Sequence, residues 1–355
     1  MNLEKRREIK ELTLAKLEEY FVSIGEKRFR AAQVFNWIYN NLVTDFAKME
    51  NIPKKLRTKL DTEFTIETLQ LHTVQTSPVT GTKKLLYITK DNSAIETVLI
   101  PEGKRMTLCI STQVGCPLDC KFCATGLMGF KRNLSVGEIV DQYFLTAKQV
   151  GKQVITNIVF MGMGEPLLNY NNTVDALEIF TNQHNNRISR NRITVSTSGI
   201  PEKITELANS PLRVKLALSL HSPFDKIRSK IMPINKKYPL KDVIKAVHYY
   251  AKTTGTRITF EYLMLKGIND TEEDIVALTK LCKSLPSKLN LIPFNSIAHM
   301  NPDGIARELE PTPQEEIERF ATKLRNNNIT VMIRNSQGDD IAAACGQLAT
   351  KKGKD

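Results

Sequence analysis

Apolar positions in roughly the first seventy residues recur with the three- and four-residue spacing of amphipathic helices. One apolar stripe lies within 14–21 and a second within 29–42. A short stretch rich in Lys and Arg follows over 54–60. The pattern predicts a small basic helical module, which could either grip a nucleic-acid backbone or simply cap the main domain.

The hydrophobic pattern then changes period. Two β-rich runs within 83–100 flank the turn-type cluster Lys90-Asp91-Asn92, which predicts a β-hairpin. Beyond it, short apolar runs alternate with helical stretches, as expected for parallel strands joined by right-handed crossovers. The predicted strands of this part are 107–111, 155–160, 193–196, 214–220, 258–264, 288–293 and 329–334.

Three helix starts carry capping-box patterns, in which a short polar side chain precedes an acidic one by three residues. They are Ser135 with Glu138, Asp270 with Glu273, and Thr312 with Glu315, where Pro313 would take the first helical position.

Together these elements predict an α/β fold, a full or partial barrel with a helical N-terminal domain and a connecting β-hairpin. We expect the helical domain over 1–75, the hairpin extension over 76–104, the barrel over 105–349 and a basic tail over 350–355. Polar and glycine-rich motifs follow most of the predicted barrel strands. Because the carboxyl ends of parallel strands meet at one face, these motifs predict one shared pocket.

Three of the chain's 6 cysteines stand in the run Cys116-Pro-Leu-Asp-Cys120-Lys-Phe-Cys123, after the first predicted barrel strand. Three thiolates on one tight loop can hold three irons of a 4Fe–4S cluster and leave the fourth iron open for chemistry. The alternative is a structural zinc site with Cys109 as the fourth ligand, although zinc sites usually pair two separated cysteine pairs. So few cysteines in 355 residues do not indicate a disulfide framework.

The chain carries a net charge of +12 and an isoelectric point near 9.3. An excess of this size suggests a polyanionic partner such as nucleic acid, although a merely basic soluble enzyme would also carry it. No apolar run approaches the ~18 residues of a membrane span, and the N-terminal residues do not form a secretory signal. We therefore expect a cytoplasmic protein without a membrane partner.

The combination of motifs resembles one family. The cysteine run followed by Ala-Thr-Gly is similar to the radical S-adenosylmethionine superfamily, and three further motifs narrow the resemblance to the RlmN/Cfr family of RNA methyltransferases. These are Met161-Gly-Met-Gly-Glu-Pro166, Ser219-Leu-His221-Ser-Pro and Cys345-Gly-Gln-Leu348. The similarity covers about 85–349 and extends to the N-terminal module. It implies a partial (β/α)6 radical S-adenosylmethionine barrel, one 4Fe–4S cluster held by Cys116, Cys120 and Cys123, and two S-adenosylmethionine molecules for each turnover.

The resemblance also implies roles for single residues. Cys345 would accept a methyl group and then join RNA covalently through it. Glu96 would remove the proton from the methylated carbon, and Cys109 would attack the Cys345 sulfur to release the product and form a disulfide. The expected cofactor-binding residues are Gly164, Glu165, Ser196, Ser219, Leu220, His221 and Asn295.

In isolation, several of these residues have plainer interpretations. Cys109 reads as a core residue of a strand, Glu96 as the exposed face of a hairpin, and Glu165 as a carboxylate at a helix N-terminus. Cys282 has only the core interpretation.

The activity implied by the resemblance is methylation at C2 of an adenine in 23S ribosomal RNA and of the adenosine 3′ of the anticodon in transfer RNA. The alternative within the family is C8 methylation of the ribosomal adenine. Glu165-Pro166 and Ile292-Pro293 resemble the C2 enzymes, whereas Ala342 stands where the family commonly has aspartate. An electron donor such as flavodoxin or ferredoxin is implied, and we expect a monomer.

Two functions outside this family remain as alternatives. Another radical enzyme acting on protein would account for the cysteine run but not for the charge. A zinc-stabilised RNA-binding protein would account for the charge but not for the motifs at successive strand ends.

Overall fold

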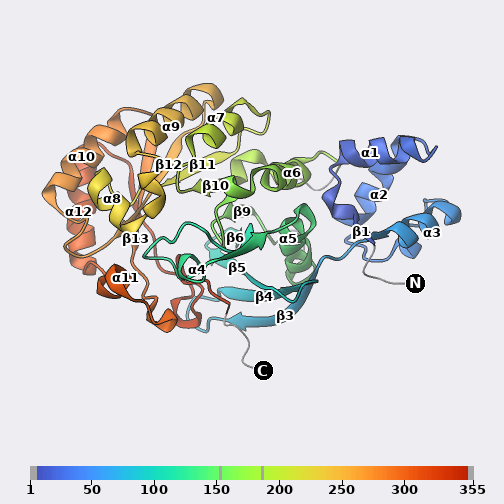
Figure 1. Ribbon diagram of the computed structural model, residues 1–355, viewed down its shortest axis with the longest axis horizontal. Coiled ribbons are helices and arrows are strands. Elements are labelled where there is room, and N and C mark those ends of the chain that lie inside the picture. The colour runs from blue at the N-terminus through green and yellow to red at the C-terminus, as the bar shows by residue number, and fades with distance from the viewer. Residues whose placement is uncertain (1–5, 152–153, 185–187, 351–355) are drawn as a thin grey trace.

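The computed structural model describes residues 6–151, 154–184 and 188–350, so the predicted basic tail over 350–355 lies outside the described residues except for Thr350. Within these ranges a ten-stranded sheet runs through the molecule in the order β14-β13-β12-β11-β10-β9-β6-β5-β4-β3 (Figure 1). From β6 to β14 all neighbouring strands pair in parallel. The parallel strands are β6 (Arg105–Cys109), β9 (Asn157–Phe160), β10 (Ile193–Thr197), β11 (Lys215–Ser219), β12 (Ile258–Met264), β13 (Ser287–Pro293) and β14 (Val331–Ile333).

Helices connect these strands and cover the outside of the curved sheet (Figure 1). Every residue of the central strand β12 is buried, as expected where both faces of a parallel sheet are covered. The predicted α/β architecture, a partial barrel of parallel strands, is therefore confirmed. The helices of this part are α5 (Val136–Val150), α6 (Tyr170–Thr181), α7 (Pro201–Asn209), α8 (Asp225–Ile231), α9 (Leu240–Thr254), α10 (Glu272–Lys283), α11 (Gly304–Glu308) and α12 (Gln314–Asn326).

The predicted hairpin is present as β4 (Lys83–Thr89) and β5 (Ala94–Glu102), and it belongs to the barrel sheet because β5 pairs with β6. A further strand, β3 (Leu69–Thr76), pairs with β4 and was not predicted. Most of the β3 side chains are exposed at the edge of the sheet, so the strand lacks the alternating apolar pattern that would reveal it. The expected domain boundaries at 75 and 104 stay predictions.

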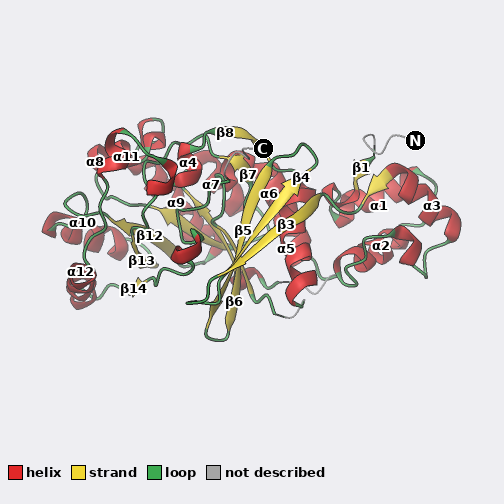
Figure 2. Ribbon diagram, turned by 90° about the horizontal axis from the view of Figure 1, so that it is seen from below, coloured by secondary structure: helices red, strands yellow, loops and turns green. Residues whose placement is uncertain are grey.

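The N-terminal module consists of α1 (Leu14–Ser23), α2 (Phe29–Tyr39) and α3 (Lys54–Glu63), as the helical pattern predicted. It lies at one end of the elongated molecule, with α10 and α12 at the other end (Figure 2). No helix among the described residues has both the length and the apolar character needed to cross a bilayer.

Of the three predicted capping boxes, the one that joins Ser135 and Glu138 is confirmed at the start of α5. The prediction at Asp270 is wrong by one residue, since Thr271 caps α10 together with Asp274. The carboxylate of Asp270 instead accepts hydrogen bonds from Gly267 N and the Thr312 hydroxyl. The third box is also wrong, because Thr312 is used in this contact and Pro313 takes the N-cap position of α12.

A buried ion pair joins the N-terminal segment to the barrel. Lys10 donates to Asp141 of α5, and both side chains are almost completely inaccessible. The Asp141 carboxylate also accepts hydrogen bonds from Thr68 N at 2.6 Å and Thr68 Oγ1 at 2.7 Å, and from Leu69 N at 3.3 Å. Burying a charged pair is costly, but removing one partner leaves the other charge unpaired and is more costly still.

We therefore expect Asp141→Asn to lower the free energy of unfolding by about 3 kcal/mol, because the Lys10 ammonium would stay buried without its counter-charge. Urea denaturation of the full chain measures this value. The control is Asp61→Asn, which removes the same charge from an exposed ion pair with Arg6 and should cost under ~0.5 kcal/mol. Equal stabilities of the two variants would show that the buried pair does not hold the module in place.

Candidate active site

A cavity opens at the carboxyl ends of the parallel strands and spans about 1040 Å³ when its open solvent is included. Its lining brings together motifs that are up to 229 residues apart, from Cys116 to Cys345. The predicted site residues that line it are Cys116, Cys120, Cys123, Gly164, Glu165, Ser196, Ser219, His221 and Cys345.

A small hairpin supports the cysteine loop. The loop leaves β7 (Gln113–Gly115), and after α4 (Ala124–Leu127) the chain returns as β8 (Phe130–Asn133), which pairs with β7. Gly115 has a φ of +72°, and a Cβ there would lie 1.9 Å from the Gly129 carbonyl oxygen. Only glycine fits this crossing, so the hairpin closes tightly and brings the cysteines to the cavity.

The donor set of the loop fits an iron–sulfur cluster. Burial raises the pKa of the Cys116 thiol to about 12 and raises the pKa values of Cys120 and Cys123 as well. Three such thiols become thiolates together only when a strongly positive group binds them. No three metal-ligating side chains in the described ranges are grouped to hold a single ion, as the zinc alternative requires. A four-iron cluster needs a wider arrangement, because each cysteine binds a different iron.

Gly164 and Glu165 form the wall beside the cysteines. Gly164 has a φ of +98°, and a Cβ there would lie 2.5 Å from Gln113 Cβ, so the position requires glycine. The Glu165 carboxylate is buried and accepts hydrogen bonds from Leu167 N at 3.0 Å and from Ser198 N and Oγ at 2.8 Å. Burial raises the pKa of Glu165, and the Ser198 amide is the main group that opposes this rise. The helix-cap interpretation of Glu165 is thus correct in geometry, yet the same carboxylate faces the cavity.

His221 contributes a neutral ring. Burial lowers its pKa to about 3, and its Nδ1 accepts a hydrogen bond from Leu263 N at 3.0 Å. The ring also packs edge-on against Phe122 of the cysteine loop. Leu220 does not line the cavity. Its backbone N–H donates to Glu261 O and its carbonyl accepts from Arg228, so no backbone polar group of Leu220 is without a protein partner.

Arg228 is a fully buried cation that the sequence analysis missed. Its guanidinium donates to the carbonyls of Ser198, Ser219 and Leu220 and to Asn235 Oδ1. It thereby fixes the loops after β10 and β11, which carry the predicted cofactor residues. An arginine in an amphipathic helix gives no sequence signal of burial, so only the fold could reveal it.

A second, smaller cavity lies beside the first and spans about 560 Å³ when its open solvent is included. Cys109 and Cys345 both line it, and both are free thiols in the structure. Burial raises the pKa of Cys109 to about 12, and the nearby Cys345 raises it further. Cys109 lines this cavity and not the first, which does not favour its use as a fourth ligand for zinc. Cys345 lines both cavities and is exposed to them.

Asn295 lies with the second cavity instead of the first. Its Nδ2 donates to the Cys345 carbonyl at 3.2 Å, and its Oδ1 accepts from the Ser336 hydroxyl at 2.6 Å. In this conformation Asn295 positions the Cys345 loop, and its expected cofactor contact stays a prediction.

The segment that carries Cys345 is tied directly to the cysteine loop. Ala124 N donates to the Gly346 carbonyl at 2.7 Å, and the Thr125 hydroxyl donates to the Leu348 carbonyl at 2.6 Å. Ala342 begins this segment with a φ of +49°, where aspartate is tolerated better than alanine. The departure from the family pattern at Ala342 therefore adds local backbone strain, although Ala342 itself lines neither cavity.

Glu96 is buried, which corrects the interpretation of this residue as the exposed face of a hairpin. Its carboxylate pairs with Lys84 Nζ at 3.2 Å and accepts from Ala349 N at 3.1 Å. Lys84 also donates to the Ala342 carbonyl. Glu96 and Lys84 therefore hold both ends of the Cys345 segment, and Glu96 lines neither of the two cavities.

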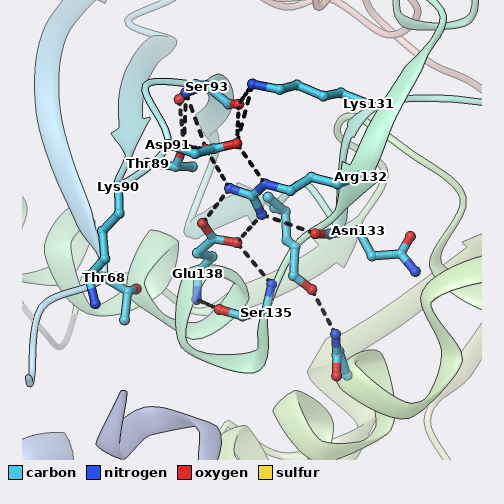
Figure 3. A network of polar contacts seen from close by, with 12 residues as sticks. Thr68, Thr89, Lys90, Asp91, Ser93, Lys131, Arg132, Asn133, Ser135 and Glu138 are labelled. Carbon is cyan, nitrogen blue, oxygen red and sulfur yellow. Dashed lines mark hydrogen bonds and ion pairs between the residues drawn. The ribbon is translucent and has the colours of Figure 1, made fainter. Parts of the chain in front are cut away.

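The turn of the same hairpin is fixed to the cysteine-loop hairpin by Arg132 of β8. Its guanidinium lies between the carboxylates of Asp91 and Glu138 and makes two hydrogen bonds to each (Figure 3). The bond to Glu138 is the main cause of a raised pKa of Arg132, and the bond to Arg132 lowers the pKa of Asp91. The strand that carries Glu96 and the loop that carries the cysteines thus keep one relative position.

Comparison with known proteins agrees with the class that the fold and the cysteine loop define. The profile of the radical SAM superfamily, named for S-adenosylmethionine, matches residues 110–279. The profile described as the ribosomal RNA large subunit methyltransferase N-terminal domain matches residues 7–66. A crystal structure of a radical SAM methyltransferase from Sphaerobacter thermophilus superimposes with a TM-score of 0.88, at 41% identity over 96% of this chain and 98% of the other.

Full-length relatives are also similar. The chain is 41% identical to a probable dual-specificity RNA methyltransferase RlmN of Flavobacterium johnsoniae, over 99% of both chains. It is 44% identical to the dual-specificity RNA methyltransferase RlmN of Pseudomonas entomophila, over 95% of this chain and 89% of the relative. The chain therefore belongs to the RlmN family of radical SAM methyltransferases.

The backbone at Gly164 provides a test of the cofactor wall. Gly164→Ala should weaken S-adenosylmethionine binding at least about tenfold, because the added Cβ displaces Gln113 or the loop itself. Calorimetric titration of the anaerobic protein measures the affinity. Gly255→Ala is the matched control, since Gly255 also has a positive φ of +69° but has no atom within 4 Å of the added Cβ. An unchanged affinity in Gly164→Ala would remove this loop from the cofactor site.

Proposed function

We propose that this protein methylates C2 of an adenine in 23S ribosomal RNA and of the adenosine 3′ of the anticodon in transfer RNA. The observation that carries the proposal is the position of Cys345, which lines both the three-cysteine cavity and the cavity that holds Cys109. An enzyme that needs one radical site and two further cysteines would place them in this way. The full-length similarity to RlmN proteins supports the same reaction.

The chemistry of the target explains why such a site is needed. Adenine C2 lies between two ring nitrogens and is too electron-poor to attack a sulfonium methyl group. A carbon radical can add to this position where a polar methyl donor cannot. The 4Fe–4S cluster and S-adenosylmethionine, bound by the three cysteines and the Gly164–Glu165 wall, supply the radical chemistry.

In this proposal the chain's own residues perform the remaining tasks. Cys345 carries the transferred methyl carbon on its sulfur and becomes linked to the RNA through it. Glu96 takes the proton from C2. The Cys109 thiolate then attacks the Cys345 sulfur. A disulfide forms as the bond between that sulfur and the carbon breaks, the released carbon keeps the bonding electrons and takes up a proton to become the methyl group, and a reductant later restores both thiols.

Glu96 is a buried carboxylate whose pKa is raised by burial, while Lys84 opposes this rise. A raised pKa suits a group that must hold a proton after taking it. Because Glu96 contacts Ala349 and not the cavities, the Cys345 segment must shift for the carboxylate to reach the base. The electron donor is a small redox protein such as flavodoxin or ferredoxin in this proposal, and the enzyme acts as a cytoplasmic monomer.

The function is tested in cells that have or lack the gene. Mass spectrometry of nucleosides from purified ribosomal and transfer RNA should show 2-methyladenosine only when the gene is present. Loss of 8-methyladenosine in its place would establish the C8 reaction. Unchanged nucleosides in both RNA fractions would overturn the proposal.

The role of Cys109 is tested by Cys109→Ala. The RNA should stay covalently attached to Cys345, because no thiol is placed to attack that sulfur. Gel electrophoresis under denaturing conditions would then show a protein–RNA band that ribonuclease removes. Cys282→Ala is the matched control, since Cys282 is equally buried in α10 and lines neither cavity. Normal turnover by Cys109→Ala would contradict the assigned role.

A further inference from the structure

Arg334 lies in this site, and the proposed reaction gives it no role. It follows β14 directly, and its backbone N–H donates to the Leu291 carbonyl at 2.8 Å, which fixes the start of its side chain. It lines both cavities, together with Met161, Ile292, Cys345 and Gly346. Arg334 therefore stands at the boundary where the two cavities meet, beside the cysteine that must touch the RNA.

The charge of Arg334 is unusual for this site. Among the described residues that line either cavity, it is the one Lys or Arg. Its side chain is exposed, and within the described part of the chain the guanidinium forms no hydrogen bond or ion pair. Arg228, the other arginine nearby, is buried and has its donors used by carbonyls. Arg334 thus presents a free guanidinium fork to the space around Cys345.

The surroundings of Arg334 place its charge close to the reacting groups. Cys345 is exposed to the cavities but lies deep within the site, and burial raises its pKa as it raises the pKa of Glu261. The positive charge of Arg334 is the main influence that opposes this rise at both groups. Glu261 is nevertheless satisfied elsewhere, because its Oε1 accepts from Asn290 Nδ2 at 3.0 Å. Arg334 and Glu261 do not form an ion pair, so a structural salt bridge does not explain why an arginine stands here.

An RNA nucleotide that reaches Cys345 must bring its phosphate into partly enclosed space. An unpaired phosphate would be costly there, since it loses water without gaining a counter-charge. The planar fork of an arginine matches two phosphate oxygens and is less strongly hydrated than a lysine ammonium. An exposed arginine that lines both cavities, and that has no side-chain partner in the described part of the chain, offers this contact without first breaking another.

We infer that Arg334 binds a phosphate that adjoins the target adenosine and so places the base against Cys345. This inference rests on the proposed function, because it assumes an RNA substrate. The competing anion is the carboxylate of S-adenosylmethionine. It is disfavoured because Gly164 and Glu165 line only the first cavity, whereas Arg334 lines both cavities and extends to the second one, where Cys109 lies.

The test is a double-mutant cycle in which the arginine of the protein and the phosphate of the RNA are altered separately and together. RNA hairpins that contain the target adenosine carry ordinary linkages or one uncharged methylphosphonate, placed either 5′ or 3′ of that adenosine. Fluorescence anisotropy gives the affinity of the reconstituted enzyme and of Arg334→Gln for each RNA. The control is Arg319→Gln, which removes an exposed arginine on α12 that lines neither cavity.

At one of the two linkages, the methylphosphonate should weaken binding to the unaltered enzyme about tenfold and binding to Arg334→Gln less than about twofold. Arg334→Gln should bind the ordinary RNA about tenfold more weakly, and its salt dependence should fall by roughly 0.7 log units per log of salt, the loss of one contact. Arg319→Gln should respond to the methylphosphonate as the unaltered enzyme does.

If the methylphosphonate and Arg334→Gln weaken RNA binding independently of each other at both linkages, so that their effects are additive, Arg334 does not bind either phosphate and the inference is overturned. Weaker binding of S-adenosylmethionine alone by Arg334→Gln, with unchanged RNA affinity, would assign it to the cofactor carboxylate and also overturn the inference. These outcomes differ from a failure of the proposed function, in which the unaltered enzyme would neither bind nor methylate the ordinary RNA. The affinity of the unaltered protein for the methylphosphonate RNAs can be measured without any variant, so the inference can be tested even if Arg334→Gln does not fold.

Discussion

Two hydrogen bonds between loops that are more than 200 residues apart hold this site together. Ala124 N to Gly346 O and Thr125 Oγ1 to Leu348 O fasten the Cys345 segment to the turn that follows the cysteine run. Both contacts use backbone carbonyls, so they fix the path of the segment while the Cys345 thiol stays free. The two cavities meet at Cys345 because of this fastening, and the proposed chemistry requires that they meet.

Around that contact, charged side chains with several hydrogen bonds each, some of them fully buried, hold the surrounding segments together. Arg228 ties the strand-end loops, Arg132 ties the hairpin turn to the cysteine-loop hairpin, and Asp141 ties the N-terminal segment to α5. Each buried charge has several hydrogen-bonding partners, which is the condition under which such groups are tolerated. Arg334 differs, because it is exposed and its guanidinium has no partner among the described residues, as expected of a group that binds a ligand.

The contacts of Glu96 differ from those expected of a catalytic base. A catalytic base must reach its substrate, yet here Glu96 and Lys84 hold the two ends of the Cys345 segment. The same contacts that exclude Glu96 from the cavity keep the segment closed. RNA entry and the exposure of this carboxylate are therefore coupled in the proposed reaction, since one segment controls both.

The local pattern of residues was sufficient for much of this protein. Apolar periodicity predicted the barrel strands and the helical module, and the spacing of Cys116, Cys120 and Cys123 predicted a loop suited to a cluster, because these signals depend on near neighbours. Periodicity failed at β3, an exposed edge strand, and at two of the helix caps, where Asp270 and Thr312 bond to each other across the fold. Motif resemblance brought Cys109, Cys345 and Glu96 into the site but could not say how they are held. The burial of Glu96 and Arg228, the placement of Asn295 beside Cys345, and the free guanidinium of Arg334 were decided by tertiary structure alone, because burial and pairing depend on which distant segments the fold brings together.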